Sequence, residues 1–500
     1  MIVADWLHGQ ARRCPLATAL IAPGGEVISY GALDERVAGL QLRLRGARVE
    51  PGDRVLALLP SGTALVELLH AVARAGAVLA PLEPRSTSAE ALQAASLIRP
   101  RVVLAAPAAE AVAVAVARAH GARLWCGDPD GAALDDAPAK RDDAVAEPRL
   151  DLDAPHTIVF TSGTTGRPRG IVLSAGNHLA SARASAERLG VRADDRWLAC
   201  LPLHHVGGLA VLLRAAISGS AVLLQRGFAP EAVVRALRTD GVTQLSLVPT
   251  ALRRLLATPY AEPCALRVLL LGGARAEHEL VGEARRRGWP VAPTYGLTET
   301  CSQVATARPD EPLPEAGFVG APLAGTHVRI VRDDGSGAAP GEPGDIEVSG
   351  PTVARGVLGD DGTLRPLASD GWLRTADRGA LDANGALIVL GRRDDVIVSG
   401  GENVAPEEVE GVLLAHPAVA DAGVAGVADA EWGHVVCAWI VPRPGVAPSL
   451  EEVRRACAGR LARHKLPRRL VLVDALPRTT SGKLQRRALV ASLDERLPTV

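Results

Sequence analysis

The sequence predicts an α/β fold in which a large N-terminal domain of doubly wound sheets with a β-rich subdomain precedes a small, mobile C-terminal α+β domain. Strand-like apolar runs alternate with helical periodicity up to about residue 300, which is typical of parallel sheets covered by helices. Residues 320–390 have the closely spaced Gly, Asp and Pro of β-hairpins. The length of 500 residues exceeds what one hydrophobic core usually supports. We expect domains at 1–393 and 394–500.

Composition excludes several classes of partner. The net charge of −1 gives no overall attraction to nucleic acid or to an anionic membrane. The two longest apolar stretches are interrupted, one by Pro107 and Glu110 and the other by Arg214, so neither stretch predicts a membrane span. The seven cysteines are scattered singly, which favours a reducing compartment over a disulfide scaffold or a zinc site. We therefore expect a cytoplasmic protein, monomeric or homodimeric, without a nucleic-acid partner.

The N-terminal 150 residues predict alternating helices and strands. Helical spacing of apolar residues covers 30–45, a buried strand covers 54–60, a second helix covers 63–75, and another strand begins at residue 77. This order implies a parallel sheet, and none of these elements has a catalytic candidate. The Asp-, Pro- and Ala-rich residues 128–153 predict a connecting loop.

A polar loop follows the apolar residues 158–160. The segment 161–170 offers three glycines, four hydroxyls and two arginines. Glycines let successive N–H groups turn toward an anion, so the segment suits a polyphosphate, although it lacks the Walker spacing. The alternative is a polar surface turn between a strand and a helix at about 174–189. The candidate phosphate ligands are Thr161, Ser162, Gly163, Thr164, Thr165 and Gly166.

Later units of the same kind place small or polar residues at strand ends. The strand 267–271 ends in Gly272, Gly273 and Ala274, where ligands of open α/β sheets bind, so a flat ring could lie there. Upstream, His204 and His205 precede Gly208. These histidines either line a substrate pocket or bind backbone groups at a strand end, and no third ligand at a suitable spacing predicts a metal.

The segment beginning at Tyr295-Gly296 has the chemistry for a nucleotide and its metal. Tyr295 can stack on a base, Thr298 can donate a hydrogen bond to a phosphate, and Glu299 offers the oxygen ligands that Mg²⁺ prefers. By residue type alone, the start of a helix explains Thr298 and Glu299 at least as well. Downstream, Asp377 could accept two ribose hydroxyls or occupy a hairpin turn.

The last 100 residues predict a separate domain. A tight turn at Gly400-Gly401 leads into a helix at 406–415, and a second, arginine-rich helix is expected at 450–463. Lys483 follows a glycine near the end, and it is one of only three lysines in a chain with 52 arginines. A compact ammonium on a flexible stem suits a site where phosphoryl and carboxylate charge develop.

Six of these motifs occur in the order found in the adenylate-forming enzymes, which include acyl-CoA synthetases, luciferases and peptide-synthetase adenylation domains. The sequence resembles this family over nearly its whole length, with Arg169 where the family usually has lysine. The resemblance implies ATP, Mg²⁺ and coenzyme A as cofactors and a small carboxylic acid as substrate. It also implies that Lys483, Glu299, Thr298 and Arg392 are catalytic, with Glu299 holding the metal and Arg392 on ribose or phosphate.

The resemblance further implies two reactions in one site. The acid would attack the α-phosphorus of ATP, and the small domain would then rotate about Asp394, so that Gly400-Gly401 helps to admit the thiol of CoA. Relatives that activate amino acids usually have an aspartate near His205 to pair with the amine, and its absence here indicates an acid without an α-amino group.

Within the family, the chain is most similar to the branch of 2-succinylbenzoate–CoA ligases of menaquinone synthesis. The similar segments are 201–209, 270–273, 295–304 and 400–404. Arg214 pairs either with the second carboxylate of such a substrate or with a protein carboxylate. Another acyl- or aryl-CoA synthetase is the first alternative, and a non-catalytic nucleotide-binding relative is the second.

Overall fold

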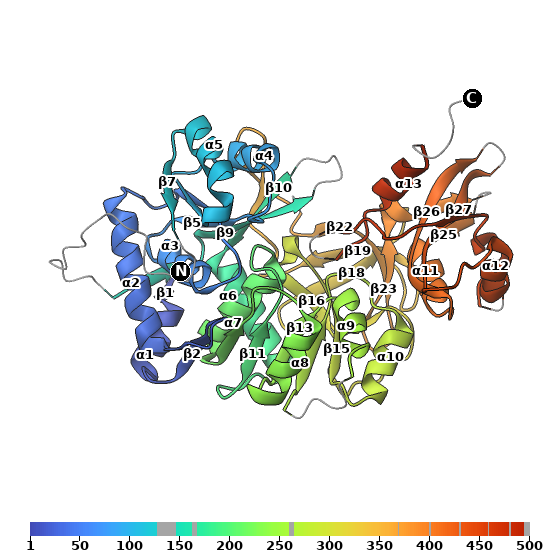
Figure 1. The fold of residues 1–500 in the computed structure, drawn as a ribbon, viewed down its shortest axis with the longest axis horizontal. Coiled ribbons are helices and arrows are strands. Elements are labelled where there is room, and N and C mark those ends of the chain that lie inside the picture. Colours follow the sequence, from blue (N-terminus) through green and yellow to red (C-terminus); the bar gives the residue numbers. More distant parts are fainter. Residues whose placement is uncertain are drawn as a thin grey trace.

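The computed structural model describes residues 1–127, 147–162, 168–259, 265–368, 370–399, 402–429, 432–458, 460–479 and 482–494. The predicted ligands Gly163, Thr164, Thr165, Gly166, Gly400 and Gly401 lie outside the described residues, as do the side chains of Ser162 and Asp394. The α/β class and the division into a large N-terminal part and a small C-terminal part are confirmed (Figure 1). The boundary at residue 393/394 stays a prediction.

The first large sheet has eight strands and mixes two directions. Its strands β4 to β7 and β9 pair in parallel, and β9, β10, β20 and β21 pair antiparallel. The strand order is β21 (Leu364–Arg365), β20 (Gly356–Leu358), β10 (Pro168–Ser174), β9 (Pro155–Ser162), β5 (Val78–Pro81), β4 (Arg54–Leu58), β6 (Val102–Ala105) and β7 (Arg123–Cys126). The helices along this part of the chain are α3 (Thr63–Arg74), α4 (Ser88–Ile98) and α5 (Glu110–His120), after the short 3-10 helix η1 (Pro107–Ala109).

The second large sheet also has eight strands. Six of them form a parallel set, and an antiparallel strand closes each edge. The strand order is β16 (Ser302–Thr306), β15 (Val291–Leu297), β14 (Val268–Leu271), β13 (Gln244–Leu247), β11 (Arg196–Ala199), β12 (Ala221–Leu224), β2 (Thr18–Ile21) and β3 (Val27–Ser29). The associated helices are α1 (Trp6–Arg13), α2 (Tyr30–Gly46), α6 (Ala175–Leu189), α7 (Val206–Ser218), α8 (Pro230–Thr239), α9 (Pro249–Leu256) and α10 (His278–Arg286), and β1 (Ile2–Ala4) pairs with β8 (Arg149–Asp151).

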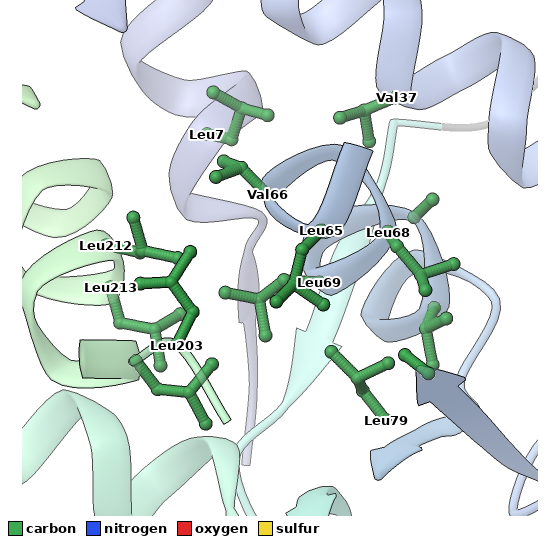
Figure 2. Close-up of a cluster of buried hydrophobic side chains, with 14 of the residues drawn as sticks. Leu7, Val37, Leu65, Val66, Leu68, Leu69, Leu79, Leu203, Leu212 and Leu213 are labelled. Atoms are coloured by element: carbon green, nitrogen blue, oxygen red, sulfur yellow. The ribbon is translucent and has the colours of Figure 1, made fainter. Parts of the chain in front are cut away.

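One hydrophobic core joins the two large sheets. Leu79 of the first sheet and Trp197 of the second belong to the same buried cluster, together with leucines of α3 and α7. Figure 2 shows Leu65 and Leu69 of α3 packed between these layers. The sheets therefore form one body, which fixes the strand ends of both relative to each other.

The remaining strands form two smaller sheets. The β-subdomain is the antiparallel sheet predicted for 320–390, in the order β17 (Phe318–Gly320), β23 (Leu387–Arg392), β22 (Leu373–Leu381), β19 (Gly344–Ser349) and β18 (His327–Val331). The C-terminal sheet contains β25 (Glu402–Val404), β24 (Ile397–Ser399), β27 (Gly433–Pro442), β26 (Val419–Asp429) and β28 (Arg469–Leu472). Its helices are α11 (Pro406–Leu414), α12 (Leu450–Ala458) and α13 (Arg486–Asp494), and the 3-10 helices are η2 (Thr298–Thr300), η3 (Arg393–Asp395) and η4 (Arg463–Lys465).

The structure adds to or corrects the sequence analysis at three places. The polar loop 161–170 does not lead directly from a strand to a helix, because it joins the antiparallel strands β9 and β10. Gly208, predicted with the histidines to line the substrate pocket, lies inside α7, and His205 is the N-cap of that helix. The helix expected at 450–463 ends at Ala458. Among the described residues, no helix is both long and apolar enough to cross a membrane.

Candidate functional site

The predicted nucleotide-binding segments meet where β13, β14 and β15 end. Gly273 and Ala274 are exposed after β14, so their backbone is open to a ligand. Val248 follows β13 and lies next to Gly273, because a Cβ added to Gly273 would be 3.2 Å from Val248 Cγ1. Gly272 has a different role, because a Cβ there would lie 2.6 Å from Thr294 Cγ2. Strand packing therefore requires a glycine at residue 272.

The loop of Lys483 reaches the same strand ends from the C-terminal part. A Cβ on Gly482 would lie 2.9 Å from Thr250 Oγ1 and 3.5 Å from Val248 Cγ2. Lys483 keeps access to solvent, yet neighbouring protein desolvates it in part and lowers its pKa below 10.5, helped by the positive charge of Arg392 and opposed by Asp377. The tail lysine thus lies within electrostatic range of the two residues predicted to bind ribose and phosphate, Asp377 and Arg392.

Asp377 is held from two sides. The hydroxyl of Tyr295 donates to Asp377 Oδ2 over 2.7 Å, and Arg392 Nε lies 3.5 Å from Asp377 Oδ1. Tyr295 is only 9% exposed, and its burial, together with the negative charge of Asp377, raises its pKa well above 10. The phenol is therefore a hydrogen-bond donor at any physiological pH, and it fixes the orientation of the carboxylate. Base stacking by the Tyr295 ring stays a prediction.

Glu299 lies beside the end of the phosphate hairpin. Arg169 pairs with Thr161 across β9 and β10, and its Nη1 is 3.8 Å from Glu299 Oε1. Thr298 and Glu299 form a single 3-10 turn, so the helix expected there is confirmed only as a short one. One carboxylate beside a polyphosphate loop fits Mg²⁺, which is usually held by one or two carboxylates together with substrate phosphates. Among the described residues, no cluster of three metal-binding side chains competes with this arrangement.

The histidine pair lies at the start of α7, near Glu83, which the sequence analysis did not identify. His204 Nε2 is 3.5 Å from Glu83 Oε2, and the rings of His204 and His205 are 4.3 Å apart. Burial, and then the neighbouring His205, lowers the pKa of His204 to about 4, so the imidazole is neutral at pH 7. A Cβ on Gly208 would lie 2.3 Å from the Pro202 carbonyl oxygen, so local packing already explains that glycine.

Arg214 is a buried cation without a carboxylate partner in the described part of the chain. It is 3% exposed, its Nη2 lies 3.3 Å from Ser302 Oγ, and its guanidinium lies 5.9 Å from the centre of the Trp197 ring. Its Nε has no hydrogen-bond partner among the described residues, and burial lowers the pKa of the guanidinium to about 10. The alternative of a protein salt bridge is therefore not realised with any described residue.

Sequence reasoning missed three of these contacts. Glu83 beside His204, Arg169 beside Glu299 and Ser302 beside Arg214 join residues that are far apart in the chain. No periodicity or local motif reports such pairs, because only the packing of the two sheets brings them together. The one usable sequence signal for a site residue here was a charged residue within an apolar stretch, and it identified Arg214.

Comparisons with known proteins agree with this geometry. Residues 7–358 match the model of the AMP-binding enzymes, and residues 408–483 match the model of the AMP-binding enzyme C-terminal domain. A 2-succinylbenzoate–CoA ligase from Bacillus cereus is 37% identical over 493 residues, which is 98% of each chain.

One related enzyme has been solved in several liganded states. The o-succinylbenzoate CoA synthetase from Bacillus subtilis, in complex with its acyl-adenylate intermediate, is 35% identical over 98% of each chain, with a TM-score of 0.89. Its complex with ATP and magnesium ion gives 0.87 at 35% identity, over 98% of this chain and all of that one. A double mutant bound to a product analogue gives 0.74, again at 35% identity over 98% of each chain. The chain therefore belongs to the AMP-binding enzyme family and is an adenylate-forming ligase.

Proposed function

We propose that the protein is an ATP-dependent acid–CoA ligase whose acid is 2-succinylbenzoate, an aromatic dicarboxylic acid. One observation carries the choice of acid: the buried Arg214 has no described carboxylate partner, so the second carboxylate of a diacid can supply the missing charge. The absence of an aspartate near His205 argues against an α-amino acid. Curated relatives with this activity, over nearly the same length, support the same substrate.

In the first reaction, a substrate carboxylate oxygen attacks the α-phosphorus of ATP and expels pyrophosphate. Arg392 and Lys483 would balance the negative charge on the transferring phosphoryl group, and Asp377, which lies 3.5 Å from Arg392, would accept ribose hydroxyls. Mg²⁺, when bound at Glu299, would neutralise phosphate oxygens. Thr161 and the rest of the phosphate loop would orient the pyrophosphate leaving group.

In the second reaction, the CoA thiol attacks the acyl carbonyl and expels AMP, which leaves a thioester. The loop of Lys483 rests on Val248 and Thr250 at the strand ends in this structure, so we infer that the present orientation of the C-terminal domain serves adenylate formation. The higher TM-score with the adenylate complex than with the product-analogue complex supports this inference. Rotation about Asp394 would then withdraw the lysine before the thiol enters. Because the proposed reaction consumes ATP and CoA, we further propose that the protein is located in the cytoplasm.

Pyrophosphate release and thioester formation, measured with a panel of acids, test this function. We expect 2-succinylbenzoate to exceed benzoate and medium-chain monoacids in kcat/KM by at least about tenfold, because only the diacid pairs with a buried guanidinium. Equal rates across the panel would discard the diacid and leave another acyl- or aryl-CoA synthetase. Absence of pyrophosphate release with every acid would point to a nucleotide-binding protein without catalysis.

A further inference from the structure

The turn that presents Glu299 contains two residues in backbone conformations that side chains rarely adopt. Cys301 has φ of 52° and Ser302 has φ of 94°, and neither is a glycine. Such conformations cost free energy and persist only where the surroundings determine them. Gly296 shows how tight the turn is, because a Cβ there would lie 1.6 Å from the Ser302 carbonyl oxygen. The contacts that hold this turn therefore determine where Glu299 lies.

One face of α6 makes two of these contacts, both with Cys301. The hydroxyl of Ser181 donates to the Cys301 carbonyl oxygen over 2.8 Å, and His178 Nδ1 lies 3.2 Å from Cys301 Sγ. His178 and Ser181 are each 3% exposed. The two residues are three positions apart, so they project from the same side of the helix.

A third residue of this face holds the other side of the turn. Asn177 Nδ2 donates to the carbonyl oxygens of Pro351 and Val353 over 2.8 and 2.9 Å. The next residue, Ala354, donates its N–H to the Glu299 carbonyl oxygen over 2.8 Å. The backbone of Glu299 is thus reached from α6 both through Cys301 and through Ala354.

The same face is tied to the phosphate hairpin. Ser174, the last residue of β10, caps α6 and exchanges hydrogen bonds with Asn177. His178 Nε2 lies 2.8 Å from Thr157 Oγ1, on the strand that leads into the phosphate loop. Both strands of the hairpin and both sides of the Glu299 turn therefore meet on three side chains of one helix.

We propose that Asn177, His178 and Ser181 are positioning residues that set the distance between Glu299 and the strands β9 and β10, and hence the binding of the Mg²⁺–ATP complex. This inference rests on the proposed role of Glu299. It assigns the three residues no contact with substrate. A merely structural role would change stability without changing the dependence of nucleotide binding on Mg²⁺.

The test uses Ser181→Ala with Ser185→Ala as its matched control. Ser185 is on the same face of α6 and is fully buried, and its Oγ has no partner in the described part of the chain, so the two substitutions differ chiefly in the bond to Cys301. The binding of an unreactive ATP analogue with a methylene bridge between its α- and β-phosphorus atoms is measured by calorimetry, with and without Mg²⁺. We expect Ser181→Ala to raise the Mg²⁺ concentration that gives half of the maximal effect on analogue binding. The expected rise is about three- to tenfold, the range for one lost hydrogen bond.

Glu299→Gln separates failure of this inference from failure of the proposed role of Glu299. If Glu299→Gln abolishes the effect of Mg²⁺ while Ser181→Ala behaves like Ser185→Ala, the positioning role is refuted. If Glu299→Gln leaves the effect of Mg²⁺ intact, the assignment of the metal to Glu299 is itself wrong. Cys301→Ala provides a second variant, which removes the contact with His178 but keeps the Cys301 carbonyl, and we expect it to shift the Mg²⁺ dependence in the same direction.

Discussion

The hydroxyl of Tyr295 donates a hydrogen bond to Asp377 Oδ2 over 2.7 Å and so links the second large sheet to the β-subdomain. Both residues are buried, at 9% and 7% exposed. A buried carboxylate keeps one orientation only while its partners hold it, and the other oxygen of Asp377 faces Arg392 at the longer distance of 3.5 Å. The Tyr295 hydroxyl is therefore the stronger determinant of where Asp377 presents its oxygens to a ribose.

Replacing Tyr295 by phenylalanine should weaken ATP binding. Loss of a hydrogen bond to a charged group predicts a rise of about tenfold in the KM for ATP, with a smaller change in kcat. The measurement is pyrophosphate release at saturating acid. Tyr30→Phe is the control, because the Tyr30 hydroxyl donates to the Ala215 and Ser220 carbonyl oxygens in the core. Equal KM values for the two variants would show that Asp377 needs no help from Tyr295.

Replacing Lys483 by alanine should affect only the first reaction. We expect adenylate formation to fall by about 10²- to 10³-fold, the range for removing one group that stabilises transition-state charge. Thioester formation from supplied acyl-adenylate should stay near the unmodified rate. Lys465→Ala is the matched control, since that lysine is paired with Glu408 at 2.6 Å. Equal loss of both reactions in Lys483→Ala would contradict the two-orientation mechanism.

The pH dependence of adenylate formation should reflect the lowered pKa of Lys483. The reaction needs the charged ammonium, so its rate falls as pH rises through that pKa, and a pKa below 10.5 moves this fall to lower pH than for a free lysine. Stopped-flow or quench measurements on each reaction would show the alkaline decline only in the first. In Lys483→Arg the decline should disappear over the same range, because arginine stays charged. A decline that persists in this variant would have another origin.

Replacing Arg214 by methionine should separate substrate recognition from stability. The KM for 2-succinylbenzoate should rise by about 10- to 100-fold, whereas that for benzoate should hardly change. The melting temperature should stay the same or rise, because the substitution removes a buried charge that no described carboxylate pairs with. A large fall in melting temperature, with equal losses for both acids, would mean that Arg214 serves the fold.

Sequence patterns predicted most of the strand ends and the motifs that follow them. These features depend on local apolar periodicity and on the Gly, Pro and polar residues that end a strand or helix. The β14 strand, which ends at Leu271 just before Gly272, and the helix α6 are examples. The hairpin at the phosphate loop was missed, since the strand Pro168–Ser174 shows no alternation: five of its seven residues are buried. Buried strands and buried helices cannot be distinguished by period alone.

The pairs within the site could not be predicted for a different reason. Arg169 with Glu299, and Ser181 with Cys301, come together only through the packing of α6 between the hairpin and the second sheet. No local rule encodes that packing. The early end of α12 at Ala458 is likewise invisible in a stretch whose arginines continue at helical spacing to residue 463.

Gly482 lets the lysine loop rest directly on Thr250 and Val248, in a backbone conformation with φ of 82°. Any side chain at residue 482 would separate the loop of Lys483 from Thr250 and Val248 of the large domain. This separation would raise the free energy of the orientation in which the Lys483 loop contacts Val248 and Thr250, relative to an orientation in which the loop has moved away. A single methyl group at residue 482 would therefore disfavour adenylate formation more than thioester formation.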